Sequence, residues 1–262
     1  MNGKKPTILV CNDDGIVARG IASLIEVAKD FGRVVVVAPD SPQSAQGHSI
    51  TIEDPIRIRR VNLFGDEVEA YECSGTPVDC VKIAKNVILK EYTIDLCLSG
   101  VNHGSNASSN VLYSGTMSAA MEASLEAIPA IGFSLLDFSA DADFSASQQI
   151  IRQLVQKALT KGLGNTHLLN VNIPKLPLAQ IKGIRICRQA KGHWSEDFQE
   201  GTDPMGRPYY WLTGKYIYQD EGDDSDIWAL ENGYVSVVPI MHDLTHYTAL
   251  SSMEHLAEWV IS

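Results

Sequence analysis

Two adjacent carboxylates, Asp13 and Asp14, directly follow the apolar run Thr7–Cys11 and its neighbour Asn12, and they precede Gly15. Ionised carboxylates repel each other, and a buried strand disfavours both of them. In a turn eased by glycine the alternation of side chains along a strand lapses, so both groups can approach one cation. The pair is also typical of an Asx turn or a helix cap, and on this motif alone we favour that structural role.

Further polar side chains follow two other strand-like segments. Ser44 follows the apolar run Val34–Ala38, and Asn102 and Asn106 follow the run Ile94–Leu98. Parallel strands bring such loops to the same edge of a sheet, where ligands bind in α/β proteins. The oxygen atoms of these side chains are hard ligands, which suit Mg²⁺, Mn²⁺ or Ca²⁺ rather than zinc. The same loops also contain His48, Ser49 and His103.

Ser114, Gly115 and Thr116 begin a predicted helix of small residues. Free backbone N–H groups and two hydroxyls at a helix N-terminus can hold a phosphate, although an ordinary N-cap would need the same residue types. A candidate anion site in the same sheet as a candidate cation site favours phosphoryl chemistry. The similar segment around Thr76 and Asp79 is explained by capping alone, so we assign it a structural role.

The elements that must position these residues alternate between strand-like and helix-like patterns. The alternation predicts an α/β fold, with a Rossmann-like, doubly wound and mostly parallel sheet. Two segments, Ser49–Val61 and Glu67–Cys73, resemble exposed strands near an edge, because Pro55 would interrupt a central ladder. Predicted helices cover the ranges Ile21–Phe31, Gly75–Leu89, Ser114–Ala127 and Ser145–Leu159.

After Asn165 the character of the sequence changes. We expect a core over residues 1–190, a protruding β-hairpin arm over 191–233, and a C-terminal strand and helix over 234–262. The segment "DPMGRP" predicts a turn between the two strands of the arm. The arm is rich in aromatic residues, which on an exposed hairpin commonly mark a subunit interface.

Charge, cysteines and motifs exclude several classes of protein. A net charge of −11 argues against a surface for polymeric nucleic acid. The sequence shows neither a secretory leader nor an apolar run of membrane-spanning length, so we expect a cytoplasmic protein without membrane contact. Its five scattered cysteines favour buried thiols in a reducing compartment. The sequence contains no P-loop, no G-x-G-x-x-G after the first strand and no G-x-S-x-G elbow.

Six segments together resemble, in order and at fitting spacing, the SurE family of stationary-phase survival nucleotidases. They are "ILVCNDDG", "VVAPDSPQSAQGHSIT", "GTPVDCV", "LSGVNHGSN", "YSGTMSAAMEA" and "GYVSVVPIMHDLT". The resemblance covers nearly the whole chain. It implies a metal-dependent phosphatase, a 5′-nucleotidase that also accepts 3′-monophosphates, and in some members short polyphosphate. It further implies a homodimer or homotetramer whose C-terminal arm and helix are exchanged between subunits.

The resemblance also assigns roles to individual residues. It implies that one divalent cation per subunit, Mg²⁺ or Mn²⁺, binds to Asp13, Asp14, Ser44 and Asn102. It implies that the substrate phosphate binds to Asn106, Ser114, Gly115 and Thr116. We expect Asp13 or Asp14 to orient or deprotonate the attacking water, with an aspartyl-phosphate intermediate as the less favoured route.

The sequence leaves several points open. It does not decide the preferred base, the preferred phosphate position, the physiological metal, or a role for His242, His246 or Tyr247. Two rivals to a nucleotidase remain, since a fold does not fix a function. One is a transferase that binds a sugar phosphate or nucleotide, and the other is a non-catalytic metal- or nucleotide-binding module whose aromatic arm binds a protein.

Overall fold

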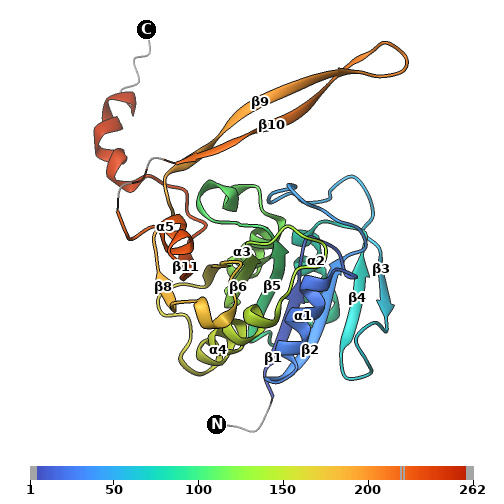
Figure 1. Ribbon diagram of the computed structural model, residues 1–262. Coiled ribbons are helices and arrows are strands. Elements are labelled where there is room, and N and C mark those ends of the chain that lie inside the picture. Colours follow the sequence, from blue (N-terminus) through green and yellow to red (C-terminus); the bar gives the residue numbers. More distant parts are fainter. Residues whose placement is uncertain (1–4, 219, 221, 258–262) are drawn as a thin grey trace.

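A twisted central sheet organises the protein in the computed structural model, which describes residues 5–218, 220 and 222–257 (Figure 1). Within that part of the chain, nine strands pair in the order β3-β4-β2-β1-β5-β6-β7-β11-β8. Their bounds are β1 (Thr7–Cys11), β2 (Arg33–Pro39), β3 (Ile58–Val61), β4 (Glu69–Cys73), β5 (Leu96–His103), β6 (Ala130–Leu135), β7 (Leu168–Ile173), β8 (Ile184–Ile186) and β11 (Val235–Ile240).

The sheet is mostly parallel, as the sequence predicts. Strands β4, β2, β1, β5, β6 and β7 run parallel to one another, whereas β3 is antiparallel to β4 and β11 is antiparallel to β7. Every residue of β1 is buried, as expected for a central strand covered on both faces. The point at which strand order reverses, between β1 and β5, is where a doubly wound sheet places its ligand.

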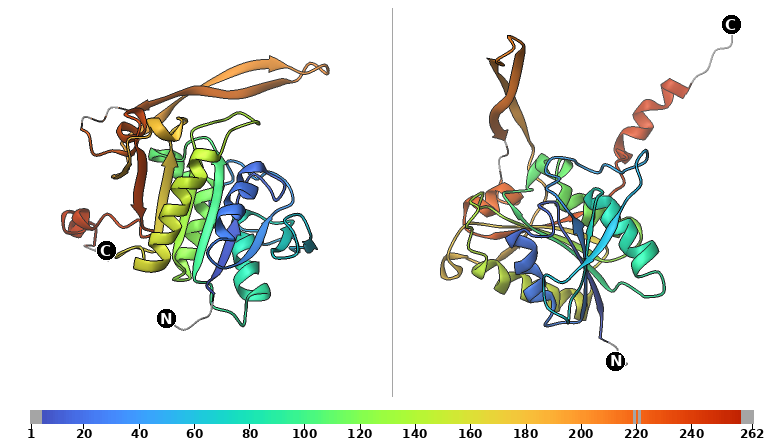
Figure 2. Two further views of the ribbon diagram at one scale, coloured as in Figure 1. Left: turned by 60° about the horizontal axis from the view of Figure 1, so that its bottom comes forward. Right: turned by 90° about the vertical axis from the view of Figure 1, so that its right-hand side faces the viewer.

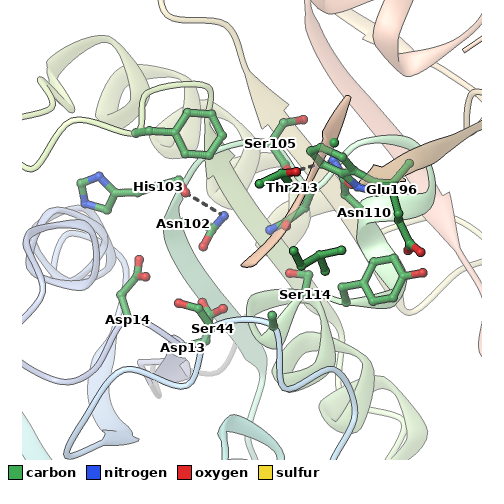
Figure 3. Close-up of a pocket in the computed structure, with 17 residues that line it drawn as sticks. Asp13, Asp14, Ser44, Asn102, His103, Ser105, Asn110, Ser114, Glu196 and Thr213 are labelled. Atoms are coloured by element: carbon green, nitrogen blue, oxygen red, sulfur yellow. Dashed lines mark hydrogen bonds between the residues drawn. The ribbon is translucent and has the colours of Figure 1, made fainter. Parts of the chain in front are cut away.

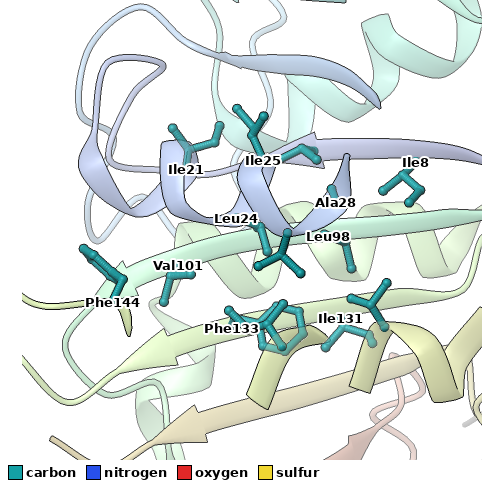
Figure 4. Close-up of a cluster of buried hydrophobic side chains, with 14 of the residues drawn as sticks. Ile8, Ile21, Leu24, Ile25, Ala28, Leu98, Val101, Ile131, Phe133 and Phe144 are labelled. Atoms are coloured by element: carbon teal, nitrogen blue, oxygen red, sulfur yellow. The ribbon is translucent and has the colours of Figure 1, made fainter. Parts of the chain in front are cut away.

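Helices cover both faces of the sheet (Figure 2). On one face α1 packs with α4, and on the other α2 packs with α3. Figure 4 shows Leu24 and Ile25 of α1 above Leu98 and Phe133 of the sheet, all of them fully buried. The helices are α1 (Arg19–Ala28), α2 (Pro77–Ile83, continued by the wider turn Ala84–Ile88), α3 (Gly115–Leu125), α4 (Ser145–Lys161) and α5 (Asp226–Glu231), with short turns of helix at Ser108–Leu112 and Leu178–Gln180. No helix in the described ranges is long and apolar enough to cross a membrane.

The segment Ser49–Val61 is only partly a strand, which corrects the sequence-based prediction. Its last four residues form β3, at the edge of the sheet as expected. Its first residues are held by the start of α2 instead: Thr76 donates its hydroxyl to Ser49 O at 2.8 Å, and Thr51 donates its hydroxyl to Asp79 at 2.6 Å. Because these contacts occupy the beginning of the segment, it cannot extend the edge ladder there.

The predicted arm is a two-stranded hairpin of β9 (Gly192–Thr202) and β10 (Pro208–Tyr218), which extends well beyond the sheet (Figure 1). The turn Asp203–Arg207 joins its strands, and Asp203 accepts N–H bonds from Met205 and Arg207 there. A helical segment, Tyr247–Ala257, lies apart from the sheet and buries none of its residues. The C-terminal helix expected within residues 234–262 is therefore present over Tyr247–Ala257, and residues 258–262 lie outside the described part of the chain.

Candidate active site

A cavity of about 610 Å³ opens at the carboxyl ends of β1 and β5 (Figure 3). The four predicted metal ligands all line it, although they come from three separate places: the turn after β1, the loop after β2 and the end of β5. Two of the predicted phosphate-binding residues, Asn106 and Ser114, line the same cavity. The structure therefore brings the candidate cation site and the candidate anion site together. The predicted metal ligands that line the cavity are Asp13, Asp14, Ser44 and Asn102.

Asp13 is held rigidly at the floor of the cavity. Its side chain is only 3% exposed, and the Thr116 hydroxyl donates a hydrogen bond to Asp13 Oδ1. The backbone carbonyl of Asp13 accepts a bond from Gln43 N at 2.7 Å. Burial raises the pKa of Asp13 to about 6, and the neighbouring charge of Asp14 adds to this rise while the Thr116 bond opposes it. The carboxylate thus lacks the positive partner that its burial calls for.

Asp14 has the same need. Its Oδ2 atom is buried and accepts no hydrogen bond from the part of the chain that the structure describes. Burial raises the pKa of Asp14, with His103 opposing the rise. An unpaired, buried carboxylate oxygen is costly unless a cation or a donor faces it. The pair of carboxylates therefore fits a bound cation.

Asn102 and Ser44 add neutral oxygen atoms to the carboxylates. The amide nitrogen of Asn102 donates to Gly104 O at 3.0 Å, which leaves its amide oxygen on the side of Asp13 and Ser44 (Figure 3). No group of three or more His, Cys, Asp or Glu side chains arranged for a metal occurs among the described residues. Two carboxylates, one amide and one hydroxyl form an all-oxygen set, which matches the preference of Mg²⁺ or Mn²⁺.

The N-terminus of α3 lies against Asp13. Ser114 caps this helix by accepting a bond from Met117 N at 3.0 Å. Gly115 packs so closely on Asp13 that an added Cβ atom would lie 2.6 Å from the Asp13 Cβ. Thr116 is fully buried, and its hydroxyl is used to hold Asp13. Ser114 is thus the residue of this turn whose side chain reaches the cavity, while the other two set the position of the carboxylate.

A buried network of amides behind Asn106 was not predicted from the sequence. Asn106 donates from its side chain to Ser134 Oγ and from its backbone to Asn172 Oδ1, both at 2.8 Å. Asn170 donates to Asn106 O at 2.8 Å, and Asn172 donates to Asn170 Oδ1 at 2.9 Å. The signal was present in β7, where two asparagines two positions apart share one face of an otherwise apolar strand. This network fixes the loop that carries Asn106.

The base of the arm forms one wall of the cavity, which the sequence did not indicate. Trp194 and Glu196 from β9 and Leu212 and Thr213 from β10 line it. Trp194 Nε1 donates to Asn110 Oδ1 at 2.8 Å, and this bond ties the arm to the rim of the cavity. The sequence indicates an interface between subunits or with a protein partner for the arm, because aromatic residues on a hairpin do not reveal which of them face a site.

His242, His246 and Tyr247 do not line the cavity of this chain, although all three are described. All three are exposed: His242 and His246 lie between β11 and the helical segment Tyr247–Ala257, and Tyr247 begins that segment. Tyr247 donates its phenolic hydroxyl to Asp243 instead. A role for these residues, which the sequence leaves open, therefore has no support from the geometry of a single chain.

Comparison with known proteins agrees with this architecture. The family model "Survival protein SurE" matches residues 8–196. A protein of Christiangramia forsetii named 5′-nucleotidase SurE is 56% identical over 263 residues, which cover 100% of both chains. The protein of the same name from Flavobacterium psychrophilum is 55% identical over 96% of this chain and 97% of its own. The crystal structure of SurE from Aquifex aeolicus superposes with a TM-score of 0.83 at 40% identity, over 97% of this chain and 100% of that one. The chain therefore belongs to the SurE family.

Proposed function

We propose that this protein is a 5′-nucleotidase that hydrolyses nucleoside 5′-monophosphates, and also 3′-monophosphates, to nucleoside and phosphate. The observation that carries the proposal is the pair Asp13 and Asp14 beside the N-terminus of α3: Asp13 is buried, Asp14 is half-buried with an unpaired Oδ2, and neither forms a salt bridge with the described residues. A cation on one side and helix N–H groups on the other suit a phosphate between them. Relatives at 53–56% identity carry the name 5′-nucleotidase SurE, which supports the same activity.

The proposal includes one divalent cation per subunit, Mg²⁺ or Mn²⁺, held by Asp13, Asp14, Ser44 and Asn102. Such a cation supplies Lewis acidity and offsets the negative charge of the phosphate. Support comes from the buried, unpaired Oδ2 of Asp14 and from the all-oxygen donor set that lines the cavity.

Different residues of the chain then take different roles in hydrolysis. One of the two aspartates orients the attacking water and accepts its proton as the oxygen bonds to phosphorus. The bond from phosphorus to the ribose oxygen breaks, and that oxygen takes up a proton to leave as the nucleoside hydroxyl. We assign the phosphate to Asn106 and Ser114, which line the cavity, and to the backbone N–H groups of Gly115 and Thr116, since the Thr116 hydroxyl holds Asp13; these donors stabilise charge on the phosphate oxygens. The aspartyl-phosphate route predicts instead a phosphorylated Asp13 or Asp14.

The apolar side of the cavity suits the nucleoside. Tyr113, Phe138, Trp194 and Leu212 line it, and they offer aromatic and aliphatic surface to a purine or pyrimidine. Glu196 lies on the same wall and can accept hydrogen bonds from sugar hydroxyls or base amino groups. We therefore expect nucleotides to be hydrolysed with a higher kcat/KM than phosphate esters that lack a base.

The test measures phosphate release from a panel of 5′- and 3′-nucleoside monophosphates and tripolyphosphate, with Mn²⁺ or Mg²⁺ and with excess chelator. We expect activity to need the metal and to fall by about 10³-fold or more in Asp14→Asn. Asp141→Asn, a change of the same kind at an exposed site, is the control and should keep full activity. Unchanged activity in Asp14→Asn would overturn the proposal. Metal binding without turnover would favour the non-catalytic binding module instead.

For the assembly, we propose a homodimer or homotetramer in which the arm within 191–233 and the helical segment Tyr247–Ala257 are exchanged around cores formed by residues 1–190, whereas β11, the strand within 234–262, stays in the sheet of its own chain. Support comes from exposed apolar side chains on these segments, including Tyr210, Trp211 and Leu256. The five buried free cysteines fit the reducing cytoplasm as the place of action. Light scattering of the purified chain tests the assembly, and a monomer at micromolar concentration would contradict it.

A further inference from the structure

The loop that carries Ser44 lies largely in solvent. Residues 40–52, here the Ser44 loop, connect β2 with the region before β3, and they form neither helix nor strand. Ala45 adopts a positive φ of 60°, which is unfavourable for a residue other than glycine. Such a loop keeps one conformation only if other parts of the chain hold it. The position of Ser44 at the cavity therefore depends on how the loop is anchored.

The Ser44 loop is anchored mainly at its two ends. At its start, Asp40 N donates to Cys73 O at 2.8 Å and Gln43 N donates to Asp13 O at 2.7 Å, and in its middle Gly47 N donates to Tyr113 O at 3.3 Å. Near its end, Thr76 donates to Ser49 O at 2.8 Å and Thr51 bonds Asp79 of α2. Between these points one side-chain contact joins the loop to α3: His48 Nε2 lies 3.0 Å from Oε2 of Glu122.

Glu122 is an unusual residue for this place in a helix. It lies on α3, the helix whose first turn holds Asp13, and its side chain is only 5% exposed. A carboxylate so buried needs charged or hydrogen-bonding partners. It has two: His48 of the Ser44 loop on Oε2, and Lys82 of α2, whose Nζ lies 2.5 Å from Oε1. Each carboxylate oxygen thus serves a different part of the structure.

The two contacts of Glu122 also fix which group donates. Because His48 and Lys82 lower the pKa of Glu122, its side chain is an ionised acceptor. The Nε2–H of His48 must then donate to Glu122 Oε2. Glu122 is part of α3, the helix whose first turn also holds Asp13. The bond from His48 therefore attaches the Ser44 loop to the helix that positions Asp13.

We propose that Glu122 is a positioning residue, which acts through His48 to hold the Ser44 loop against α3 and so sets Ser44 opposite Asp13 and Asp14. The consequence for metal affinity and turnover rests on the proposed function, whereas the effect on the loop does not. Lys82 contributes only to stability, through its ion pair with Glu122 between α2 and α3. Variants of His48 therefore test the positioning of the loop, and variants of Lys82 test the packing of the two helices.

The chain offers matched variants for a test. Glu122→Gln removes the charge, His48→Ala removes the loop contact at a residue that is partly exposed, and Lys82→Met removes the helix pair alone. Glu126→Gln is the control, because Glu126 lies one turn further on, at the C-terminal cap of α3, and pairs with Lys85, but forms no hydrogen bond or ion pair with the Ser44 loop among the described residues. His48→Gln, which keeps a side-chain N–H, serves as the conservative variant.

The first measurement is amide hydrogen exchange of peptides covering residues 40–52, without metal or substrate. We expect exchange at these peptides to rise by about tenfold in Glu122→Gln and His48→Ala, with no further rise in the double variant, because the local opening loses one charged hydrogen bond. His48→Gln should restore most of the protection. Lys82→Met and Glu126→Gln should leave these peptides unchanged.

The second measurement is calorimetric titration with Mn²⁺, followed by kcat and KM. Glu122→Gln and His48→Ala should weaken Mn²⁺ binding by about tenfold, as loss of a group that orients a metal ligand does. The proposal is overturned if Glu122→Gln behaves as Glu126→Gln in exchange of residues 40–52, or if Lys82→Met behaves as His48→Ala. If the exchange result holds while the wild-type protein releases no phosphate, the proposed function fails and the positioning of the loop stands.

Discussion

The hydroxyl of Thr116, at the start of α3, donates a hydrogen bond to Oδ1 of Asp13, at the end of β1. Two elements that are far apart in the sequence are therefore held together at the floor of the cavity. The bond fixes the direction of one carboxylate oxygen and lowers the cost of keeping it ionised. The helix that we assign to phosphate binding thus also prepares the proposed cation site.

The first prediction follows from this bond. Thr116→Val keeps the volume of the side chain but removes the hydroxyl, so we expect Mn²⁺ to bind about 10- to 100-fold more weakly, as happens when a partner of a metal ligand is lost. Titration calorimetry measures the affinity, and phosphate release measures the effect on turnover. Thr116→Ser, which keeps the hydroxyl, should stay within about threefold of the wild-type affinity. Equal affinities in the valine and serine variants would show that the hydroxyl does not support the site.

Local patterns in the sequence were sufficient for most of the fold. The cap of α2 by Thr76 is confirmed with both bonds of a capping box, because the signal lies within four residues. The helix predicted over Ile21–Phe31 is also present, but as Arg19–Ala28. Phe31 N bonds Ala28 O in a tight final turn rather than continuing the helix. Helix ends depend on such small differences, so their positions are less predictable than the helices themselves.

The candidate site could be predicted only in part, for a physical reason. Asp13, Ser44 and Asn102 follow apolar strands, and the geometry of parallel sheets brings the ends of strands together. No such rule predicts that Trp194 and Asn172 belong to the site. Their contribution depends on long-range contacts, of Trp194 with Asn110 and of Asn172 with Asn106. The loss of strand structure at Ser49 and Thr51 has the same origin, since α2 binds that segment.

The second prediction concerns the close packing of Gly115 on Asp13. In Gly115→Ala the added Cβ would lie 2.6 Å from Asp13 Cβ and 2.9 Å from Oδ2, so the carboxylate must move. Alanine favours a helix over glycine by about 1 kcal/mol, which offsets part of the cost in stability. We expect phosphate release to fall by about tenfold or more, since the Asp13 carboxylate is moved away from the position in which it faces the cavity. Thermal unfolding should show that the fold is retained.

Gly75→Ala is the matched control for this clash. Its added Cβ would lie 2.7 Å from Asp79 Cβ, against a carboxylate that lies outside the cavity. This variant should therefore lower the unfolding temperature and reduce turnover much less than Gly115→Ala does, because Asp79 contacts the end of the Ser44 loop and not the site itself. If both glycine variants lost activity only in proportion to their stability, the close approach of Gly115 to Asp13 would have no role in the site.

The third prediction concerns the wall that the arm contributes. Trp194→Phe keeps an aromatic ring but loses the indole N–H that bonds Asn110, which is worth about 1 kcal/mol, or roughly fivefold in kcat/KM. We expect this fall with nucleoside monophosphates and a smaller one with ribose 5-phosphate, which has no base to meet the wall. Steady-state kinetics with both substrates measure the difference. Trp211→Phe is the control, since Trp211 is 66% exposed on the same arm and does not line the cavity.

The wall would have no part in base recognition if Trp194→Phe lowered kcat/KM equally for both substrates. A uniform fall would instead indicate that the bond to Asn110 only holds the rim in place.

The fourth prediction is the pH dependence of the contribution that Glu122 makes to stability. Its pKa is lowered from 4.5 by the bonds from His48 and Lys82, so the folded state favours the ionised form. That stabilisation is fully present above about pH 4.5 and is lost as the pH falls through the lower pKa of the folded state. We therefore expect Glu122→Gln to lower the free energy of unfolding by about 1 to 3 kcal/mol at pH 7, and by progressively less below pH 4.5.

Urea unfolding of the wild-type protein and the variant at pH 7, 5 and 4 measures this difference directly. Glu126→Gln is the control: its pair with Lys85 is more exposed, so the variant should cost less than about 1 kcal/mol at every pH. A difference between wild type and Glu122→Gln that stayed constant down to pH 4 would contradict the prediction. In that case the variant would be destabilised through packing of the amide rather than through loss of the buried charge.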